Sequence, residues 1–163
     1  MRHMENRKAI LKRLQRMLTT DPFWSGVLAD VDALTRIHLA IFKEPYLQFI
    51  ADGKKTIETR FSQKKFPPYD AIDKGDIMLL KRSGGPVVGL CLVDQTWFYQ
   101  LDADSLDLIR EKFGAAICPE DESFWDARAE ALFASLIWVS HFSPLDPFTV
   151  AKTDRRGWVV FHD

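Results

Sequence analysis

Two apolar segments that flank a glycine turn limit the folds open to this chain. Residues 74–82 and 86–99 are rich in branched and aromatic side chains, and Ser83-Gly84-Gly85 separates them. Such a pair predicts an antiparallel β-hairpin, because glycine supplies the backbone conformations that tight hairpin turns need. At 163 residues the chain is long enough to enclose one hydrophobic core. The chain is therefore expected to form a single domain that contains this hairpin.

Further strands and helices are predicted on either side of this hairpin. Apolar patterns typical of strands occupy residues 36–42, 55–62, 135–145 and 157–163. Amphipathic helical patterns occupy residues 44–53, 102–114 and 119–133. The segment 63–73 contains two adjacent prolines and is expected to be a loop. Strands joined by hairpins, with short helices between them, predict an α+β fold: a small mixed β-barrel with helices around it.

The first 35 residues differ from the rest and are predicted to form a helical extension. Residues 1–20 hold six lysines or arginines against one acid, with apolar residues at helical spacing. Asp21-Pro22 is typical of the start of a second helix. We therefore expect an extension over residues 1–35 and the main domain over residues 36–163. The basic helix either packs as an extra layer or binds an acidic partner or RNA.

Composition excludes several classes of protein. A hydrophobic content of 47% excludes global disorder, and a net charge of −1 argues against coating nucleic acid through bulk positive charge. No apolar run is long enough to cross a membrane, and the N-terminus lacks the apolar centre of a signal peptide. We therefore expect a cytoplasmic protein. Cys91 is predicted in a buried strand, and no cysteine or histidine pattern predicts a metal site or a cofactor.

A charged stretch follows a glycine that is expected to end a helix. In a strand, Thr56, Glu58 and Arg60 project from one face, whereas Thr59 projects from the other and is expected to be exposed. Glu58 and Arg60 can pair with each other or face a common ligand. A lysine between apolar walls can lose its proton, so Lys55 with Glu58 is a candidate pair for proton transfer. The alternative is a set of exposed ion pairs that contribute little.

Together with its surroundings, this stretch resembles the ASCH domain (activating signal cointegrator homology), which belongs to the PUA-like β-barrel superfamily. Gly53, Lys55, Glu58 and Arg60 match the family pattern Gly-x-Lys-x-x-Glu-x-Arg, with "KEPY" before it and "KGD" after it. The resemblance begins near residue 36 and reaches the last strand. It implies a barrel with a cleft beside the motif, and a ligand that is RNA or a nucleotide-like small molecule.

The same resemblance implies a catalytic alternative. One branch of the family hydrolyses acylated cytidine with the motif lysine, a threonine three residues later and a separate glutamate. Lys55 matches the lysine, but Glu58 stands where that branch has threonine. Glu111 lies in the broadly corresponding helix, although the alignment there is poor. Some members are also associated with ribonuclease activity. A hydrolase that acts on acylated nucleosides or on RNA is therefore the second hypothesis.

Five residues are predicted at the site. Lys55 and Glu58 are the catalytic candidates. Arg60 is expected to bind an anionic ligand, Thr56 shares its face of the strand, and Tyr46 offers a ring on which a base can stack. Packing in the core is the alternative role for Tyr46.

The remaining candidates have strong alternatives. Phe42 is a second candidate for stacking, or a core residue. Five basic residues can contact phosphates or merely solubilise loops: Lys64, Lys65, Lys152, Arg155 and Arg156. His38 and His141 are expected to be structural. A third hypothesis is a protein-interaction domain that uses the helix 119–133, although Phe124 and Leu132 are expected to face the core.

Overall fold

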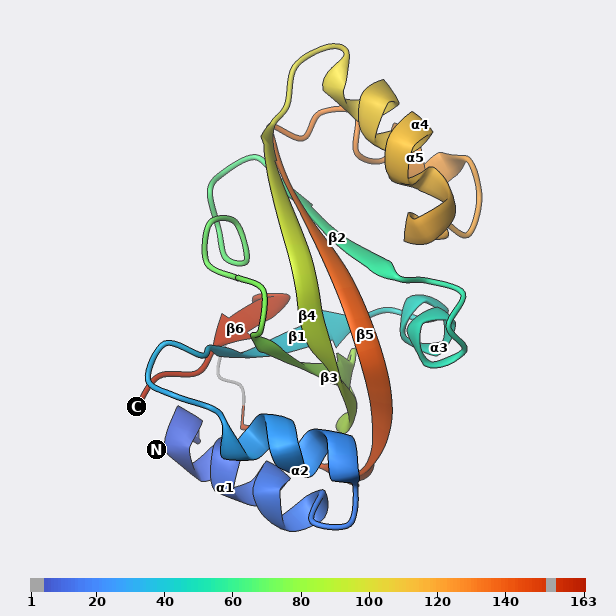
Figure 1. Ribbon diagram of the computed structural model, residues 1–163. Coiled ribbons are helices and arrows are strands. Elements are labelled where there is room, and N and C mark those ends of the chain that lie inside the picture. Colours follow the sequence, from blue (N-terminus) through green and yellow to red (C-terminus); the bar gives the residue numbers. More distant parts are fainter. Residues whose placement is uncertain (1–4, 152–154) are drawn as a thin grey trace.

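The computed structural model describes residues 5–151 and 155–163 of the protein. In this part of the chain, six strands form one mixed sheet in the order β2-β5-β4-β3-β1-β6. β1 and β3 are parallel, and the other neighbouring pairs are antiparallel. The strands are β1 (Ile37–Phe42), β2 (Ile57–Ser62), β3 (Ile77–Arg82), β4 (Val87–Gln100), β5 (Phe133–Phe148) and β6 (Trp158–Val160). Figure 1 shows the sheet strongly twisted into a half-barrel, with helices at both ends. The predicted α+β class is confirmed.

The predicted hairpin is the pair β3 and β4. Ile77 lies opposite Leu92 and Leu79 opposite Leu90, and the side chains of all four are buried or nearly so. Gly84 in the turn has a φ of +70°, which a residue with a side chain rarely adopts. β4 continues beyond the hairpin and pairs along its length with β5, so these two long strands form the backbone of the sheet. Cys91 is fully buried in β4, as predicted, and burial raises the pKa of its thiol.

The N-terminal helices pack on one face of this sheet. They are α1 (Arg7–Met17) and α2 (Pro22–Ala29). Leu14 of α1 and Trp24 of α2 are buried in the same apolar cluster as Leu39 of β1 and Leu79 of β3. The Asp21 carboxylate accepts a hydrogen bond from the Trp24 amide, so Asp21 caps α2 as its position before proline predicted. These helices therefore share a core with the sheet.

The remaining helices are α3 (Tyr46–Ala51), α4 (Ser105–Ile117) and α5 (Ser123–Asp126). The predicted helix over residues 119–133 is wrong outside Ser123–Asp126, the only helical part of that range. The Leu132 amide donates to the Ser62 carbonyl, and the Leu132 carbonyl accepts from the Leu101 amide. These bonds draw residue 132 into the sheet, so its backbone is unavailable to a helix. Phe124 is buried as expected, but the Leu132 side chain is 51% exposed.

The curvature of the sheet positions the candidate site. β2 forms one edge of the sheet and β6 the other. The Arg60 side chain on β2 donates hydrogen bonds of 2.9 Å to the carbonyls of Ile41 on β1 and of Gly157 before β6. One side chain therefore joins two edges that are far apart in the hydrogen-bonded order. No helix among residues 5–151 and 155–163 has the length and apolar character to cross a bilayer.

Candidate functional site

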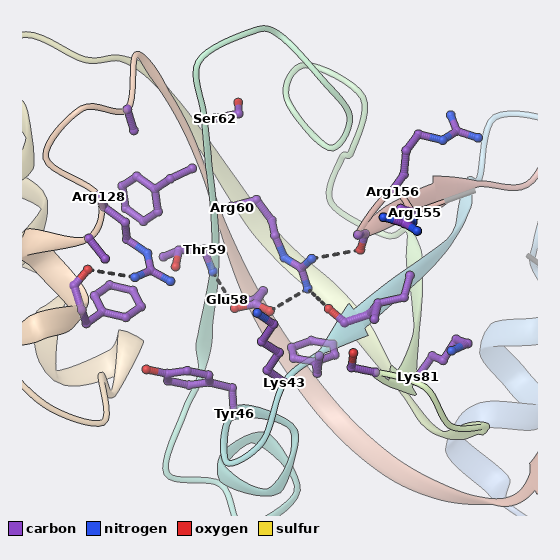
Figure 2. Close-up of a pocket in the computed structure, with 18 of the residues that line it drawn as sticks. Lys43, Tyr46, Glu58, Thr59, Arg60, Ser62, Lys81, Arg128, Arg155 and Arg156 are labelled. Carbon is purple, nitrogen blue, oxygen red and sulfur yellow. Dashed lines mark hydrogen bonds and ion pairs between the residues drawn. The ribbon is translucent and has the colours of Figure 1, made fainter. Parts of the chain in front are cut away.

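A cavity of about 840 Å³ opens between the two edges of the sheet. β2 forms its middle, the turn after α5 lies on one side, and β1 and the segment before β6 lie on the other (Figure 2). Nine charged residues are part of its described walls, beside apolar and aromatic ones. The charged residues are Lys43, Lys55, Glu58, Arg60, Lys81, Arg128, Glu130, Arg155 and Arg156. Seven of these nine residues are basic, so the cavity favours an anion.

Lys55, Glu58 and Arg60 form one connected cluster at the floor of this cavity. The Lys55 Nζ lies 3.5 Å from Glu58 Oε1, and an Arg60 terminal nitrogen lies 3.1 Å from Glu58 Oε2. Glu58 Oε1 also accepts a hydrogen bond of 2.8 Å from the Thr59 amide. Lys55 is only 2% exposed and donates a 2.6 Å hydrogen bond to the Ile117 carbonyl at the end of α4. The three charged residues that the motif brought together in sequence are therefore in contact.

The cluster places two basic groups beside one carboxylate, and burial acts together with these charges to shift their pKa values. Burial lowers the pKa of Lys55, and attraction to Glu58 offsets only part of that effect. Burial also opposes ionisation of Glu58, but Lys55 and Arg60 together outweigh it and lower the pKa of this carboxyl. The carboxylate has two partners, whereas the two cations share one. The floor of the cavity therefore carries a surplus of positive charge.

Arg60 has a structural role besides its charge. Its guanidinium lies between the rings of Phe42 and Trp158, with its carbon 5.2 Å and 5.0 Å from the two ring centres. A Cβ atom added at Gly157 would lie 3.2 Å from Arg60 Nη1, so glycine permits this close approach. Three hydrogen bonds hold the guanidinium to Ile41, Gly157 and Glu58. Loss of Arg60 therefore removes a link between the sheet edges as well as a cation.

Arg128 is one of three basic residues of the described lining that the sequence interpretation missed; the others are Lys43 and Lys81. Arg128 lies in the turn after α5, and its Nη1 donates a 2.8 Å hydrogen bond to the Phe124 carbonyl. The guanidinium carbon stacks 3.5 Å above the Phe124 ring. The side chain is half-buried, and burial lowers its pKa. The spacing of Phe124 and Arg128 by four residues was the available signal, because such residues are neighbours on a helical turn.

The predicted ligand-binding residues divide between the cavity and the surface. Tyr46 and Arg60 line the cavity, and the Tyr46 ring lies 5.3 Å below the Lys55 ammonium. Thr56 is exposed, and the described lining residues do not include it. Thr59, which was expected to be exposed, is instead buried and lines the cavity. Figure 2 shows Thr59 between Glu58 and Arg128.

The other candidates also divide. Phe42, Arg155 and Arg156 line the cavity, but Lys64 and Lys65 are exposed outside its described walls. Lys152 lies outside the described residues. Glu111 is exposed on α4, and the described lining of the cavity contains no α4 residue. No carboxylate of α4 therefore joins Lys55 and Glu58 within the described part of the chain.

The two histidines lie outside the cavity walls. The His38 ring is fully buried, with Nε2 2.8 Å from Asp76 Oδ2 and Nδ1 accepting from the Trp158 indole at 3.0 Å. His141 stacks on Phe23, with ring centres 3.8 Å apart. Both sets of contacts are structural, as expected. Across residues 5–151 and 155–163, no group of three or more histidines, cysteines or acids is arranged to hold a metal ion.

Comparisons with known proteins support a fold assignment. No protein-family model and no curated protein matches the sequence. The ASCH protein of Zymomonas mobilis superposes with a TM-score of 0.55 at 14% identity, over 69% of this chain and 73% of that chain. A serine-to-alanine variant of the same protein gives a TM-score of 0.59 at 12% identity, over 76% of this chain and 86% of that one. A tyrosine-to-phenylalanine variant gives 0.54 at 14%, over 69% and 75%.

The architecture is therefore an α+β fold with a charged cavity between the sheet edges. Within that class, the chain has the fold of an ASCH domain, as the resemblance of residues 53–60 and their surroundings implied. At identities of 12–14% the likeness establishes the fold alone.

Proposed function

We propose that the cavity binds a nucleotide-like anion, either as a small molecule or as part of an RNA chain. The surplus of basic side chains carries this proposal: seven lysines or arginines against two glutamates in the described lining. Phosphate groups are the common anions that arginine recognises with two parallel hydrogen bonds. The volume of about 840 Å³ lies within the range typical of pockets that hold a whole small molecule. A ligand of this class also favours a cytoplasmic location.

Arg128 is the proposed phosphate-binding residue. Its hydrogen bond to the Phe124 carbonyl and its stacking on the Phe124 ring fix the guanidinium without neutralising it. No acidic side chain among the described residues forms an ion pair with it. A half-buried arginine that forms no direct ion pair gains a strong, charge-assisted hydrogen bond when a phosphate arrives. Arg60, by contrast, is already paired with Glu58.

The N-terminal extension is proposed to enlarge the contact surface. Lys8, Lys12 and Arg16 are exposed on α1 at intervals of four residues, so they share one face of the helix. None of them forms an ion pair with a described acid. A row of this kind suits the backbone of a longer RNA rather than a mononucleotide.

Binding of short RNA to the Arg128→Gln variant tests the main proposal. Fluorescence anisotropy with a labelled single-stranded RNA should show an affinity about tenfold lower than that of the unsubstituted protein, since a charged hydrogen bond contributes roughly 1.5–3 kcal/mol. Affinity should also fall as salt rises, with a smaller slope for the variant.

Lys74→Gln is the matched control. Lys74 is exposed, lies outside the described lining of the cavity, and loses the same unit of charge on substitution. Its affinity should stay within about twofold of the unsubstituted protein, because an exposed charge is screened by salt. Equal losses in the two variants, or no RNA binding at low salt, would overturn the proposal.

A hydrolase that acts on acylated nucleosides or RNA is the second candidate, and the Lys55–Glu58 contact favours it. Burial lowers the pKa of Lys55, which brings the amine closer to the range in which it accepts a proton. Glu58, 3.5 Å away, is the adjacent acceptor in a proton transfer. The branch that hydrolyses acylated cytidine has its threonine at the position of Glu58, and Thr59 supplies a hydroxyl one position later.

The candidate activity predicts turnover that Lys55→Met abolishes. Acylated cytidines and short RNAs are the substrates, and product is followed by chromatography. Thermal unfolding of the variant establishes that the fold survives. Equal product from the variant and the unsubstituted protein removes this candidate and leaves the binding proposal intact.

A further inference from the structure

A second, smaller cavity adjoins the first. It encloses about 210 Å³ and shares four residues with the larger cavity: Arg60, Phe61, Ser62 and Gly157. Its other walls are Phe66, Pro67, Pro68, Ser135 and Trp158. A pocket below about 300 Å³ is too small for most complete ligands. Its continuity with the larger cavity therefore suits one part of a ligand whose remainder lies beyond Arg60.

Ser135 gives the smaller cavity a polar group that the fold leaves without a partner. It lies on β5 directly opposite Arg60 on β2, and paired residues of antiparallel strands project from the same face. The residue is only 2% exposed, yet its hydroxyl forms no hydrogen bond with any described residue. The described buried side-chain atoms that lack a partner do not include this hydroxyl, so it is open to the cavity rather than enclosed by protein. A ligand atom in the cavity is the partner that this position lacks.

Phe66 gives the same cavity an aromatic surface. Its side chain is 59% exposed, although it borders the cavity. The Phe66 amide donates to the Lys64 carbonyl, and the Phe66 carbonyl accepts from the Tyr69 amide. These turn contacts, with Pro67 and Pro68 between them, restrict the backbone that carries the ring. A restrained, exposed aromatic ring is a platform on which a nucleic-acid base can stack.

Arg60 separates the two cavities and retains hydrogen-bonding capacity. Its guanidinium carries five N–H groups, and three of them donate to Ile41, Gly157 and Glu58. The other two have no partner among the described residues. A phosphodiester that passes from one cavity to the other meets this arginine.

From these observations we propose that the smaller cavity is a second nucleotide subsite. The base of a nucleotide bound there stacks on Phe66, and the Ser135 hydroxyl forms a hydrogen bond with that base or its ribose. Arg60 contacts the phosphate that links this nucleotide to the one in the larger cavity. The preferred ligand is then an oligonucleotide of two or more residues rather than a nucleoside or mononucleotide. This inference rests on the proposed nucleotide-binding function of the larger cavity.

Paired ligands separate the subsite from general charge attraction. For each of the four ribonucleotide bases, isothermal titration compares the 5′-phosphorylated dinucleotide pNpN with the bisphosphate pNp. The bisphosphate has both phosphates but lacks the second nucleoside. For the preferred base, pNpN should bind at least about fivefold more tightly, since stacking of one base contributes about 1–3 kcal/mol.

Two variants assign that gain to the cavity. Phe66→Ala and Ser135→Ala should each remove most of the advantage of pNpN over pNp, and leave the affinity for pNp unchanged. Leu34→Ala is the control, because this leucine is 86% exposed and lies outside the described lining of both cavities. It should retain the full advantage.

The outcomes distinguish this inference from the proposed function. If pNp and pNpN bind equally for every base, or if Phe66→Ala keeps the advantage of pNpN, the second subsite is refuted and the larger cavity retains its proposed function. If neither ligand binds at low salt, both proposals fail.

Discussion

Two buried clusters of polar and charged residues both contact Trp158. They differ in how many of their hydrogen-bonding and charged groups have a partner within the protein. In the first, Asp76 accepts hydrogen bonds from His38 and from the amides of Arg36 and Asp73, at 2.8–3.0 Å. The Trp158 indole donates to the other nitrogen of His38. Since that nitrogen is an acceptor, the proton of a neutral imidazole lies on Nε2 and faces Asp76. Each of these groups has a partner within the protein, and we call this the closed cluster.

The second cluster, which we call the open cluster, has surplus charge and borders a cavity. Its Arg60 guanidinium lies over the indole of Trp158, the same side chain that donates to His38. The guanidinium carbon is 5.0 Å from the Trp158 ring centre. Lys55, Glu58 and Arg60 carry two positive charges and one negative charge, and all three line the large cavity. Neither His38 nor Asp76 is part of the described lining of that cavity.

The comparison shows that burial of charge does not by itself identify a functional site. Buried polar groups whose partners are all protein atoms position the strands, and a change in one of them is felt as stability. A buried cluster with surplus charge beside a cavity has capacity left for a ligand. Substitutions in the closed cluster should therefore change stability most, and substitutions around the open cluster should change ligand affinity more.

Asp76→Ala should have the largest effect on stability. It leaves His38 and two backbone amides without their acceptor in a site that is 3% exposed. Loss of a buried carboxylate with such partners costs about 3–5 kcal/mol of unfolding free energy. Urea unfolding measures the loss, and Asp76→Asn, which keeps the shape and one acceptor oxygen, should lose less. A loss below 1 kcal/mol for the alanine variant would contradict the closed-cluster interpretation.

Glu58→Gln should have the next largest effect. The substitution keeps the volume but leaves Lys55 and Arg60 without a counterion, at a cost of about 2–4 kcal/mol. The pKa of Glu58 is lowered in the folded protein. Its contribution is therefore present above the unfolded pKa of about 4.3, and is lost as pH falls through the lower, folded pKa. The difference in urea stability between the two proteins should shrink over that acidic window; a constant difference would count against this cause.

Local sequence patterns were sufficient to predict that the side chains of Lys55, Glu58 and Arg60 can reach one another. Strand alternation places Glu58 and Arg60 on one face, and Lys55 just before the strand is close enough to reach Glu58. Thr56 could not be placed in the same way. It precedes β2, and its backbone is engaged by Ala116 and Val139, so its side chain remains at the surface. Strand alternation holds only where the strand has begun.

Contacts between distant segments were beyond the sequence. The Arg60 bond to Gly157 joins residues 97 positions apart, and it exists because the sheet curls until its two edges meet. No local pattern specifies that curl. Arg128 was hidden for a related reason: hydrogen bonds of Leu132 to Ser62 and Leu101 end the predicted helix early and turn this region toward the cavity.

Lys55→Met should change the pH dependence of stability more than its value at pH 7. Burial lowers the folded pKa of Lys55, so the unfolded chain binds this proton more tightly. The unsubstituted protein should therefore gain stability as pH rises from the folded pKa towards the unfolded value of about 10.4. The slope is at most about 1.4 kcal/mol per pH unit, and Lys55→Met should lack it. At pH 7 the variant should lose less stability than Glu58→Gln, because Arg60 still pairs with Glu58. Urea unfolding across neutral to alkaline pH measures both, and parallel curves would contradict the prediction.

Gly157→Ala should have the smallest effect on stability and tests whether the position of Arg60 matters to the ligand. The new Cβ lies 3.2 Å from Arg60 Nη1, so the guanidinium must shift by a few tenths of an ångström against the hydrogen bonds that hold it. The cost should be below about 1 kcal/mol. Gly26→Ala is the matched control: its Cβ meets nothing within 4 Å in α2, and the change should stabilise by about 0.5–1 kcal/mol. Because Arg60 lines both cavities, Gly157→Ala should weaken binding of pNpN several-fold while Gly26→Ala leaves it unchanged. Unaltered binding in both variants would mean that the arginine joins the sheet edges without contacting the ligand.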